Sequence, residues 1–189
     1  MRLTGTPGSF DVEQLRAHYR NVAAADDRYD FAITAVDDPQ SRWLGEAVLK
    51  NIDRVNRCAG FRISLGGASQ YGRGLGTQAT RLVLEFAFGM LELHRVELEV
   101  YDFNPRARHV YEKVGFVVEG VRRDALWWDG AWHGAVLMAI LAPEWRARSR
   151  ACVAPARHPR RPWTSNPLPA RSTARLPPCA SPGPTRPTR

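Results

Sequence analysis

The sequence predicts an α/β fold in which helices cover both faces of a mixed, mostly antiparallel sheet. Segments in which apolar and polar residues alternate recur along the chain, as they do in half-buried strands. Two stretches with apolar residues three and four positions apart lie between these segments and indicate amphipathic helices. Asp129-Gly130 separates the last two strand segments. This dipeptide is typical of a two-residue hairpin turn, so those strands are expected to be antiparallel neighbours.

The bounds of the expected elements follow from this periodicity and from the turn and cap residues. Asn104 and Pro105 mark a helix start, as an N-cap followed by proline at the first helical position. Gly115 marks the end of that helix. In chain order we expect a helix over 10–22, strands over 29–36, 42–52 and 59–65, a helix over 79–90, a strand over 95–101, a helix over 105–114, and strands over 117–128 and 131–141.

The segment from Gln70 to Thr77 carries three glycines at alternate positions just before the second helix. Glycines bring no side chain to a core, so this spacing favours a loop that adopts positive φ or approaches a ligand closely. Free N–H groups and the helix dipole attract anions at such a helix start. The loop therefore predicts a phosphate or pyrophosphate site, with a ligand-free glycine turn as the alternative. A dinucleotide-binding unit is a further alternative, because Glu97, Glu99 and Asp102 lie near its expected acidic position.

Two motifs in the same order resemble the GCN5-related N-acetyltransferase (GNAT) superfamily. The first is Gly72-Arg73-Gly74-Leu75-Gly76 before a long amphipathic helix. The second, Asn104-x-x-Ala107-x-x-x-Tyr111-x-x-x-Gly115-Phe116, follows a strand. Glu119-Gly120 and Glu144-Trp145 are similar to the ribosomal-protein N-acetyltransferase branch, the RimJ/RimL type. The resemblance covers residues 29 to 145 and excludes the dinucleotide-binding fold, which has no use for the second motif.

This resemblance implies an acetyl-CoA-dependent enzyme, without a metal, that transfers an acetyl group to a primary amine of a protein N-terminus or a small molecule. Tyr111 matches the family tyrosine that protonates the leaving thiolate, and Asn104 matches the residue that hydrogen-bonds the pantetheine arm. The backbone N–H near Leu65 is expected to polarise the thioester carbonyl. The residues expected around the pyrophosphate are Tyr71, Gly72, Arg73, Gly74, Leu75, Gly76 and Thr77.

The residues leave the general base unassigned. Four candidates stand out by strand position alone, namely Glu46, Glu97, Glu99 and Glu119. Two positions depart from the family: Tyr71 stands where Gln or Arg is usual, and Ala107 stands where the RimJ/RimL branch often has serine. The second departure leaves the acid role to Tyr111. His133 lies in a tryptophan-rich hairpin, which favours cross-strand packing and a partly exposed histidine over a substrate wall or a catalytic base.

Composition divides the chain into a domain over residues 1–145 and a Pro/Arg-rich tail over residues 146–189. The tail holds ten arginines, ten prolines and no acidic residue, so the net charge of +8 conceals 17 basic against 19 acidic residues in the domain. With few large apolar residues the tail builds no core, and we expect it to be disordered. One interpretation is an arginine-rich arm with weak affinity for polyanions such as nucleic acid. The other is an extension without function.

At the N-terminus, Gly5, Pro7 and Gly8 disfavour the strand with which this family begins. We therefore expect that strand to be missing and the strand over 29–36 to be left as an exposed edge.

The remaining expectations concern surroundings and assembly. No apolar run is long enough to cross a membrane, and the three cysteines are too widely spaced for a disulfide framework, as in a cytoplasmic protein. A homodimer is compatible with the sequence. The alternatives to an enzyme are a catalytically idle CoA-binding or scaffold protein, and a protein that associates with nucleic acid or the ribosome through its basic tail.

Overall fold

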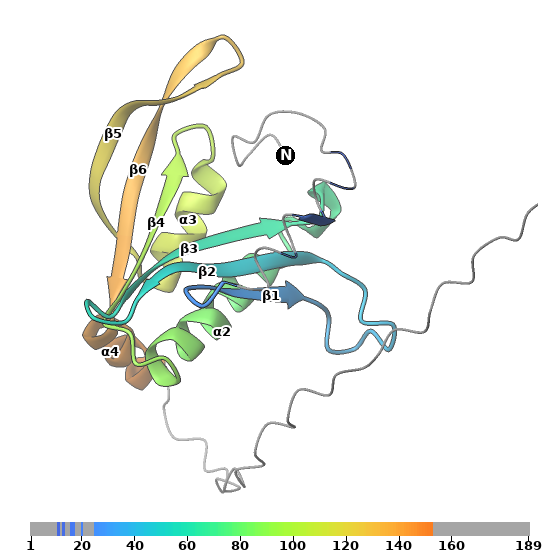
Figure 1. The fold of residues 1–189 in the computed structure, drawn as a ribbon, viewed down its shortest axis with the longest axis vertical. Coiled ribbons are helices and arrows are strands. Elements are labelled where there is room, and N and C mark those ends of the chain that lie inside the picture. Colours follow the sequence, from blue (N-terminus) through green and yellow to red (C-terminus); the bar gives the residue numbers. More distant parts are fainter. Residues whose placement is uncertain (1–10, 12, 14–15, 18–19, 21–24, 153–189) are drawn as a thin grey trace, which may run out of the picture. The chain divides into compact units, whose positions relative to one another are not determined.

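A six-stranded mixed sheet forms the centre of the domain in the computed structural model, which describes residues 11, 13, 16–17, 20 and 25–152 (Figure 1). The spatial order of its strands is β1-β2-β3-β4-β6-β5. Their bounds are Tyr29–Ile33 (β1), Gly45–Asp53 (β2), Cys58–Leu65 (β3), Arg95–Tyr101 (β4), Val117–Trp128 (β5) and Ala131–Leu141 (β6). All neighbouring strands are antiparallel except β3 and β4, which confirms the predicted fold class.

The one parallel pair of strands is short. Residues Cys58 to Gly60 of β3 lie in register with Arg95 to Glu97 of β4, and no pairing continues beyond Gly60 among the described residues. Figure 1 shows β3 and β4 diverging from this point. The middle of the sheet is therefore split, and five residues of β3 leave one backbone edge without a neighbouring strand.

The first two strands are shorter than the alternation predicts, because the loop between them has its own hydrogen bonds. The carboxylate of Asp38 accepts hydrogen bonds from the backbone N–H groups of Gln40 and Arg42. Val36 is fully exposed. The predicted strand over 29–36 therefore ends at Ile33, and the one predicted over 42–52 begins at Gly45.

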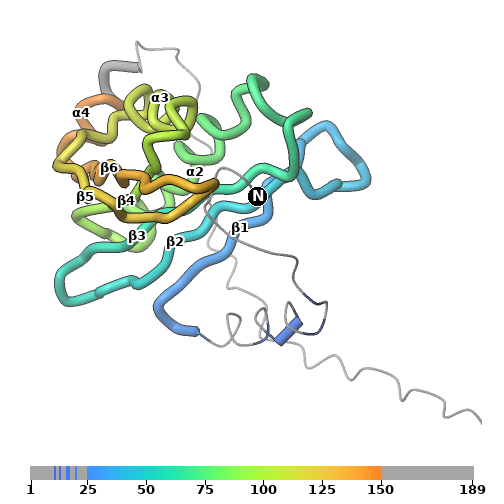
Figure 2. Tube along the Cα trace, turned by 90° about the horizontal axis from the view of Figure 1, so that it is seen from above, coloured from blue at the N-terminus to red at the C-terminus, as the bar shows by residue number. Residues whose placement is uncertain are grey.

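Helices α2 (Leu75–Gly89) and α3 (Pro105–Val114) contact each other and lie on the same side of the sheet (Figure 2). α3 has the predicted bounds, and the Asn104 side chain caps it by accepting a hydrogen bond from the Ala107 N–H at 3.1 Å. α2 begins at Leu75, earlier than the apolar periodicity predicts, because the first turn needs no buried residue. The helix predicted for the second face, over 10–22, falls almost wholly outside the described residues.

The core between the sheet and these helices is rich in aromatic rings. Phe86 of α2 meets Tyr29 and Phe31 of β1 edge-on, with ring centroids 5.2 and 5.3 Å apart. Phe61 of β3 contacts Tyr111 of α3 in the same way, at 6.4 Å. These contacts hold α2 against the β1 side of the sheet and α3 against its split centre.

A further helix, α4 (Ala142–Cys152), follows β6 and runs past residue 146, where the tail was predicted to begin. Trp145 packs against Phe88 of α2 at 6.3 Å, and the Glu144 carboxylate accepts a hydrogen bond from the Leu141 N–H. The tail composition thus begins inside a helix that is anchored by its first turn. Residues 153–189 and residues 1–8 lie outside the described part of the chain, so the predictions for the disordered tail and the missing first strand remain predictions.

Candidate functional site

The glycine loop and the start of α2 present backbone N–H groups whose arrangement suits an anion. Gly72 and Gly74 have φ values of 75° and 79°, the left-handed conformation that favours glycine. Gly74 is the N-cap of α2 and makes no side-chain cap bond, and the first turn contains no acidic residue. The N–H groups of Leu75 to Thr77 therefore lie free at the positive end of the helix dipole, and no carboxylate competes with an anion for them.

The third glycine of the loop behaves differently from the prediction. Gly76 lies inside the first turn of α2, has no positive φ, and would have open space around an added Cβ atom. Its part in the loop is therefore not a backbone conformation that only glycine adopts. Positive φ is found at Gly72 and Gly74, whereas for Gly76 the other expectation, close approach to a ligand, remains.

Two arginines bring positive charge to the same loop. Arg73 Nη1 donates a hydrogen bond to Gln70 Oε1 at 2.6 Å. The Cζ atom of Arg106, in the first turn of α3, lies 5.4 Å from the centre of the Tyr71 ring. Sequence reasoning missed Arg106, because the arginine is 33 positions past Arg73 and only the packing of α3 beside α2 brings the two near one loop.

The split between β3 and β4 presents unpaired backbone groups next to this loop. Gly66 donates its N–H to the Leu44 carbonyl on the β2 side. Because N–H directions alternate along a strand, those of Ile63 and Leu65, which lie beyond the last residues paired with β4, point the other way, toward the gap left by β4. An extended ligand lying in the gap can therefore pair with β3 as a strand would.

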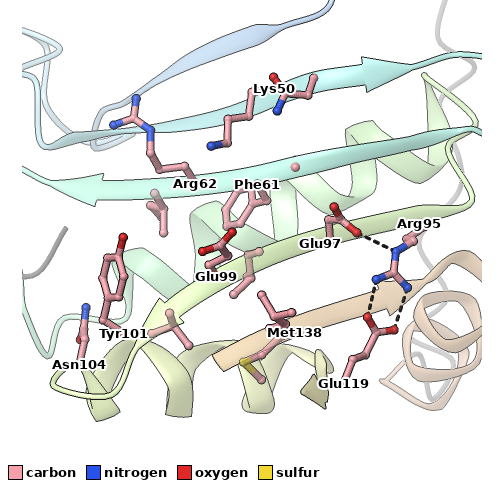
Figure 3. A pocket seen from close by; sticks show the side chains of 16 residues that line it. Lys50, Phe61, Arg62, Arg95, Glu97, Glu99, Tyr101, Asn104, Glu119 and Met138 are labelled. Carbon is pink, nitrogen blue, oxygen red and sulfur yellow. Dashed lines mark hydrogen bonds and ion pairs between the residues drawn. The ribbon is translucent and has the colours of Figure 1, made fainter. Parts of the chain in front are cut away.

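A cleft with a volume of about 420 Å³ lies at this split, lined by residues of β2, β3, β4, β5 and β6 (Figure 3). Of the residues that the sequence singled out, Asn104, Glu97, Glu99 and Glu119 line the cleft. Leu65, the glycine loop and Tyr111 are not among its lining residues. The cleft thus collects the polar strand residues, while the glycine loop lies outside it, beyond the end of β3.

Charged side chains of β4 form one wall of the cleft. Arg95 binds Glu119 of β5 through both of its terminal nitrogens, with one bond at 2.7 Å, and binds Glu97 Oε2 at 2.9 Å. This pairing with Arg95 holds the pKa of Glu119 below its usual range. Glu99 Oε1 accepts a hydrogen bond from Arg122 at 2.7 Å. Glu97 and Glu99 each keep one carboxylate oxygen without a protein donor among the described residues, whereas both oxygens of Glu119 are occupied.

The opposite wall carries cations. Lys50 of β2 and Arg62 of β3 both line the cleft. Arg62 forms an ion pair with Glu46 at 2.9 Å, and Glu46 is not a lining residue. Of the four candidate bases from the sequence, the structure therefore leaves Glu97 and Glu99 with a free oxygen in the cleft.

Tyr111 is a buried residue of α3 whose side chain is 7% exposed. Its ring packs against Phe61 and Phe116, with centroid distances of 6.4 and 5.8 Å. Burial alone raises the pKa of Tyr111 to about 12. Among the described residues, every buried side-chain oxygen either reaches solvent or has a hydrogen-bond partner. The Tyr111 hydroxyl is therefore not isolated from other groups.

The hairpin at the end of β5 and β6 contains a histidine contact that the sequence did not predict. His133 Nδ1 lies 2.8 Å from Asp102 Oδ1, and Asp102 Oδ2 accepts the Gly134 N–H at 2.8 Å. The Gly134 hydrogen bond and then the His133 contact lower the pKa of Asp102. Trp127 and Trp132 pack across the two strands at 5.2 Å, and the His133 side chain is 22% exposed, as predicted for this hairpin.

Two further absences hold for the described part of the chain. It contains no cluster of three or more His, Cys, Asp or Glu side chains with the geometry of a metal site. No helix in it is long and apolar enough to cross a membrane.

Several known proteins similar to this chain are named as acetyltransferases. A family model described as an acetyltransferase (GNAT) domain matches residues 1–117. The probable N-acetyltransferase YjcK of Bacillus subtilis (strain 168) is 35% identical over 127 residues, which are 67% of this chain and 68% of that protein. The spermidine N(1)-acetyltransferase of Vibrio cholerae is 32% identical over 60% of this chain and 65% of that protein. The [ribosomal protein uS5]-alanine N-acetyltransferase of Escherichia coli (strain K12) is 27% identical over 58% of this chain and 56% of that protein.

A solved structure of one of these relatives has a similar fold. The crystal structure of spermidine N-acetyltransferase from Vibrio cholerae in complex with CoA and spermine superposes with a TM-score of 0.71 and 25% identity, over 77% of this chain and 84% of that one. The chain spans only 56 to 68% of the length of the curated relatives named above. The family model covers more than half of the chain, and the split sheet beside a glycine loop agrees with it. The chain therefore belongs to the GNAT family and is an N-acetyltransferase of that type.

Proposed function

We propose that this N-acetyltransferase uses acetyl-CoA and transfers the acetyl group directly to the primary amine of a small molecule or a protein N-terminus. One observation carries the proposal. The β3–β4 split leaves a backbone edge open for an extended ligand, and that edge ends beside a helix start suited to a pyrophosphate. CoA combines these two features, since a pantetheine arm extends from a pyrophosphate. Small amines are supported by the spermidine-acetylating relatives and protein N-termini by the ribosomal one.

In this proposal the loop and β3 bind the acetyl donor. The N–H groups of residues 73–77 and the charge of Arg73 hold the pyrophosphate, with Tyr71 and Gly72 completing the loop. The N–H groups of Ile63 and Leu65 pair with the pantetheine amides or polarise the thioester carbonyl. Asn104, which lines the cleft beside the start of α3, contacts the pantetheine arm.

The transfer itself needs a base and an acid. The amine nitrogen attacks the thioester carbonyl carbon, the new N–C bond replaces the C–S bond, and the thiolate leaves. Glu97 or Glu99, each with a free oxygen in the cleft, takes the proton that the nitrogen loses. Tyr111 supplies a hydrogen bond or a proton to the leaving sulfur. The acetyl group thus moves from the CoA sulfur to the amine nitrogen, the nitrogen loses one proton and the sulfur gains one, and no atom is oxidised or reduced.

A glycine pair separates ligand binding from folding. Gly74→Val places a branched side chain at φ 79° and displaces the N-cap, so we expect CoA affinity to fall by about tenfold or more, in line with a left-handed penalty of about 1–2 kcal/mol. Gly89→Val is the matched control, because this glycine at the far end of α2 has no positive φ, has open space around an added Cβ atom and takes no part in the loop, so CoA affinity should stay within about threefold. Calorimetry with CoA and thermal melting measure both. Unchanged affinity in a folded Gly74→Val variant would remove the loop assignment.

Glu97→Gln and Glu99→Gln then identify the base. The variant that loses the base should lower kcat by about 100-fold or more, while CoA affinity remains that of the unmodified protein. Normal kcat in both variants, and in the double variant, contradicts a carboxylate base and leaves bulk water as the proton acceptor.

A further inference from the structure

Lys50 reaches across the sheet toward the split between β3 and β4. In the strand register Lys50 pairs with Gly60, and Gly60 pairs with Glu97. Directly opposed residues project on the same face of a sheet, so Lys50 and Glu97 share the face onto which the cleft opens. Gly60 has no side chain to separate them. A Cβ atom added there would lie 3.4 Å from Lys50 Cγ and 3.5 Å from Lys50 Cε, so the lysine stem lies over this glycine.

Lys50 also differs from the other charged residues of the cleft in its partners. Arg62 is paired with Glu46, and Arg95 is paired with Glu97 and Glu119. Lys50 forms no ion pair or side-chain hydrogen bond with any described residue, although it lines the cleft (Figure 3). Its ammonium group is therefore an unneutralised positive charge at the point where the strands separate.

The cleft thus has two unlike walls. The free oxygens of Glu97 and Glu99 on β4 suit an amine or ammonium, and the free ammonium of Lys50 on the β2 side suits an anion. We propose that the acceptor carries a carboxylate as well as its primary amine, as an amino acid does, and that Lys50 binds this carboxylate. The inference rests on the proposed function and names the substrate class of the same site.

The charge pattern also disfavours a polycation. A polyamine brings several ammonium groups and needs carboxylates without partners. Here Arg95 and Arg122 already bind the cleft carboxylates, and Lys50 repels a second ammonium group. The acceptor preference of this chain should therefore differ from that of the spermidine-acetylating relatives, although the fold is shared.

Matched amines test the carboxylate directly. Tyrosine, tyrosine amide and tyramine share one side chain and differ in having a carboxylate, a neutral amide or neither, and lysine with cadaverine forms a second pair. Spermidine is the polycation. Release of the CoA thiol from acetyl-CoA gives kcat/KM for each compound. We expect the carboxylate-bearing member of each set to be preferred by about 10- to 100-fold, the range of one charge-assisted hydrogen bond.

Variants at Lys50 assign that preference to its ammonium. Lys50→Met keeps the apolar stem over Gly60 and removes the charge, so it should abolish the preference and leave tyrosine amide within about threefold. Lys50→Glu should reverse it, with cadaverine favoured over lysine. Lys113→Met is the matched control, because Lys113, at the end of α3, is the other lysine of the chain and does not line the cleft.

The outcomes separate the two levels of the argument. Equal kcat/KM across each set, or a preference that survives Lys50→Met, overturns the role of Lys50 and leaves the acetyltransferase proposal standing. Spermidine as the preferred acceptor also overturns it. No thiol release with any of these amines or with peptides that bear a free N-terminus, in protein that binds CoA by calorimetry, overturns the proposed function itself and the inference with it.

Discussion

Removing the Tyr111 hydroxyl is the change that best separates catalysis from packing. Burial raises the pKa of Tyr111 to about 12, whereas a simple thiol has a pKa of about 8.5. Complete proton transfer from Tyr111 to a product thiolate is therefore uphill by about 3.5 pKa units, or about 5 kcal/mol. The hydroxyl then acts chiefly as a hydrogen-bond donor to the developing thiolate. A charge-assisted bond of that kind predicts that Tyr111→Phe lowers kcat by about 10- to 100-fold.

Folding and CoA binding should be little affected by this change. The phenylalanine ring keeps the contacts with Phe61 and Phe116, so we expect the melting temperature to stay within about 2 °C. Thiol release at saturating substrates measures kcat, and calorimetry measures CoA affinity. Because the hydroxyl remains protonated below pH 12 or so, the pH profile of kcat should show no falling limb from Tyr111 up to about pH 10.

Tyr101→Phe is the matched control for this experiment. Tyr101 belongs to β4 and lines the cleft, and its ring stacks on Phe103 at 5.4 Å. A normal kcat for Tyr111→Phe refutes the reasoning and leaves Tyr111 as a core aromatic. A loss confined to Tyr101→Phe would transfer the donor role to the exposed wall of the cleft.

Three further predictions concern stability. Asn104→Ala removes the cap bond to the Ala107 N–H and should destabilise the domain by about 1 kcal/mol in thermal melts, whereas no change would mean that water replaces the cap. The hydrogen bonds from Arg95 hold the pKa of Glu119 below its usual value. This pairing therefore stabilises the fold fully at pH values above the usual glutamate pKa, and the stabilisation is lost as the pH falls through the lowered pKa. Glu119→Gln should therefore flatten the acid side of the stability–pH curve, and an unchanged slope would contradict this. Deleting residues 155–189 should leave the melting temperature within about 2 °C, and a larger drop would show that the tail packs on the domain.

The C-terminal half of the fold was predictable because local signals there agree with each other. The bounds of β4, α3, β5 and β6 match the sequence prediction at every end. Alternation defines the strands, and the Asn104 cap and Gly115 define the helix. Asp129 and Gly130 both adopt positive φ, 51° and 80°, as their hairpin turn requires. The predicted bounds of the first two strands were less accurate, because the Asp38 side chain orders the loop between them through hydrogen bonds that periodicity does not reveal.

The site was predictable only where backbone conformation or a cap depends on residue type. Gly72 and Gly74 adopt positive φ and Asn104 caps α3, and a sequence pattern can reveal such conformations, whereas the ligand roles of these residues remain predictions. The pairing of Arg95 with Glu119 joins residues 24 positions apart through β6, which lies between their strands. The place of Lys50 over Gly60 depends in the same way on strand register. No local pattern contains such information.

The alternation of β4 shows why this region was easy to assign as a strand and hard to assign as a site. Glu97 and Glu99 between buried residues are typical of a sheet face that meets solvent, and that reading needs no function. The same spacing becomes a cleft wall because the neighbouring strand leaves β4 after three paired residues. The neighbouring strand β3 therefore decides whether alternating residues of β4 form a solvent-exposed face or the wall of a binding cleft. Pairing with β4 stops at Gly60 of β3, and because Gly60 has no side chain, Lys50 can reach the gap. Gly60→Val places a side chain at this point, so it should displace Lys50 and reduce the preference for carboxylate-bearing acceptors without changing β4 itself. If β4 presented only a solvent-exposed face, this substitution would have no such effect.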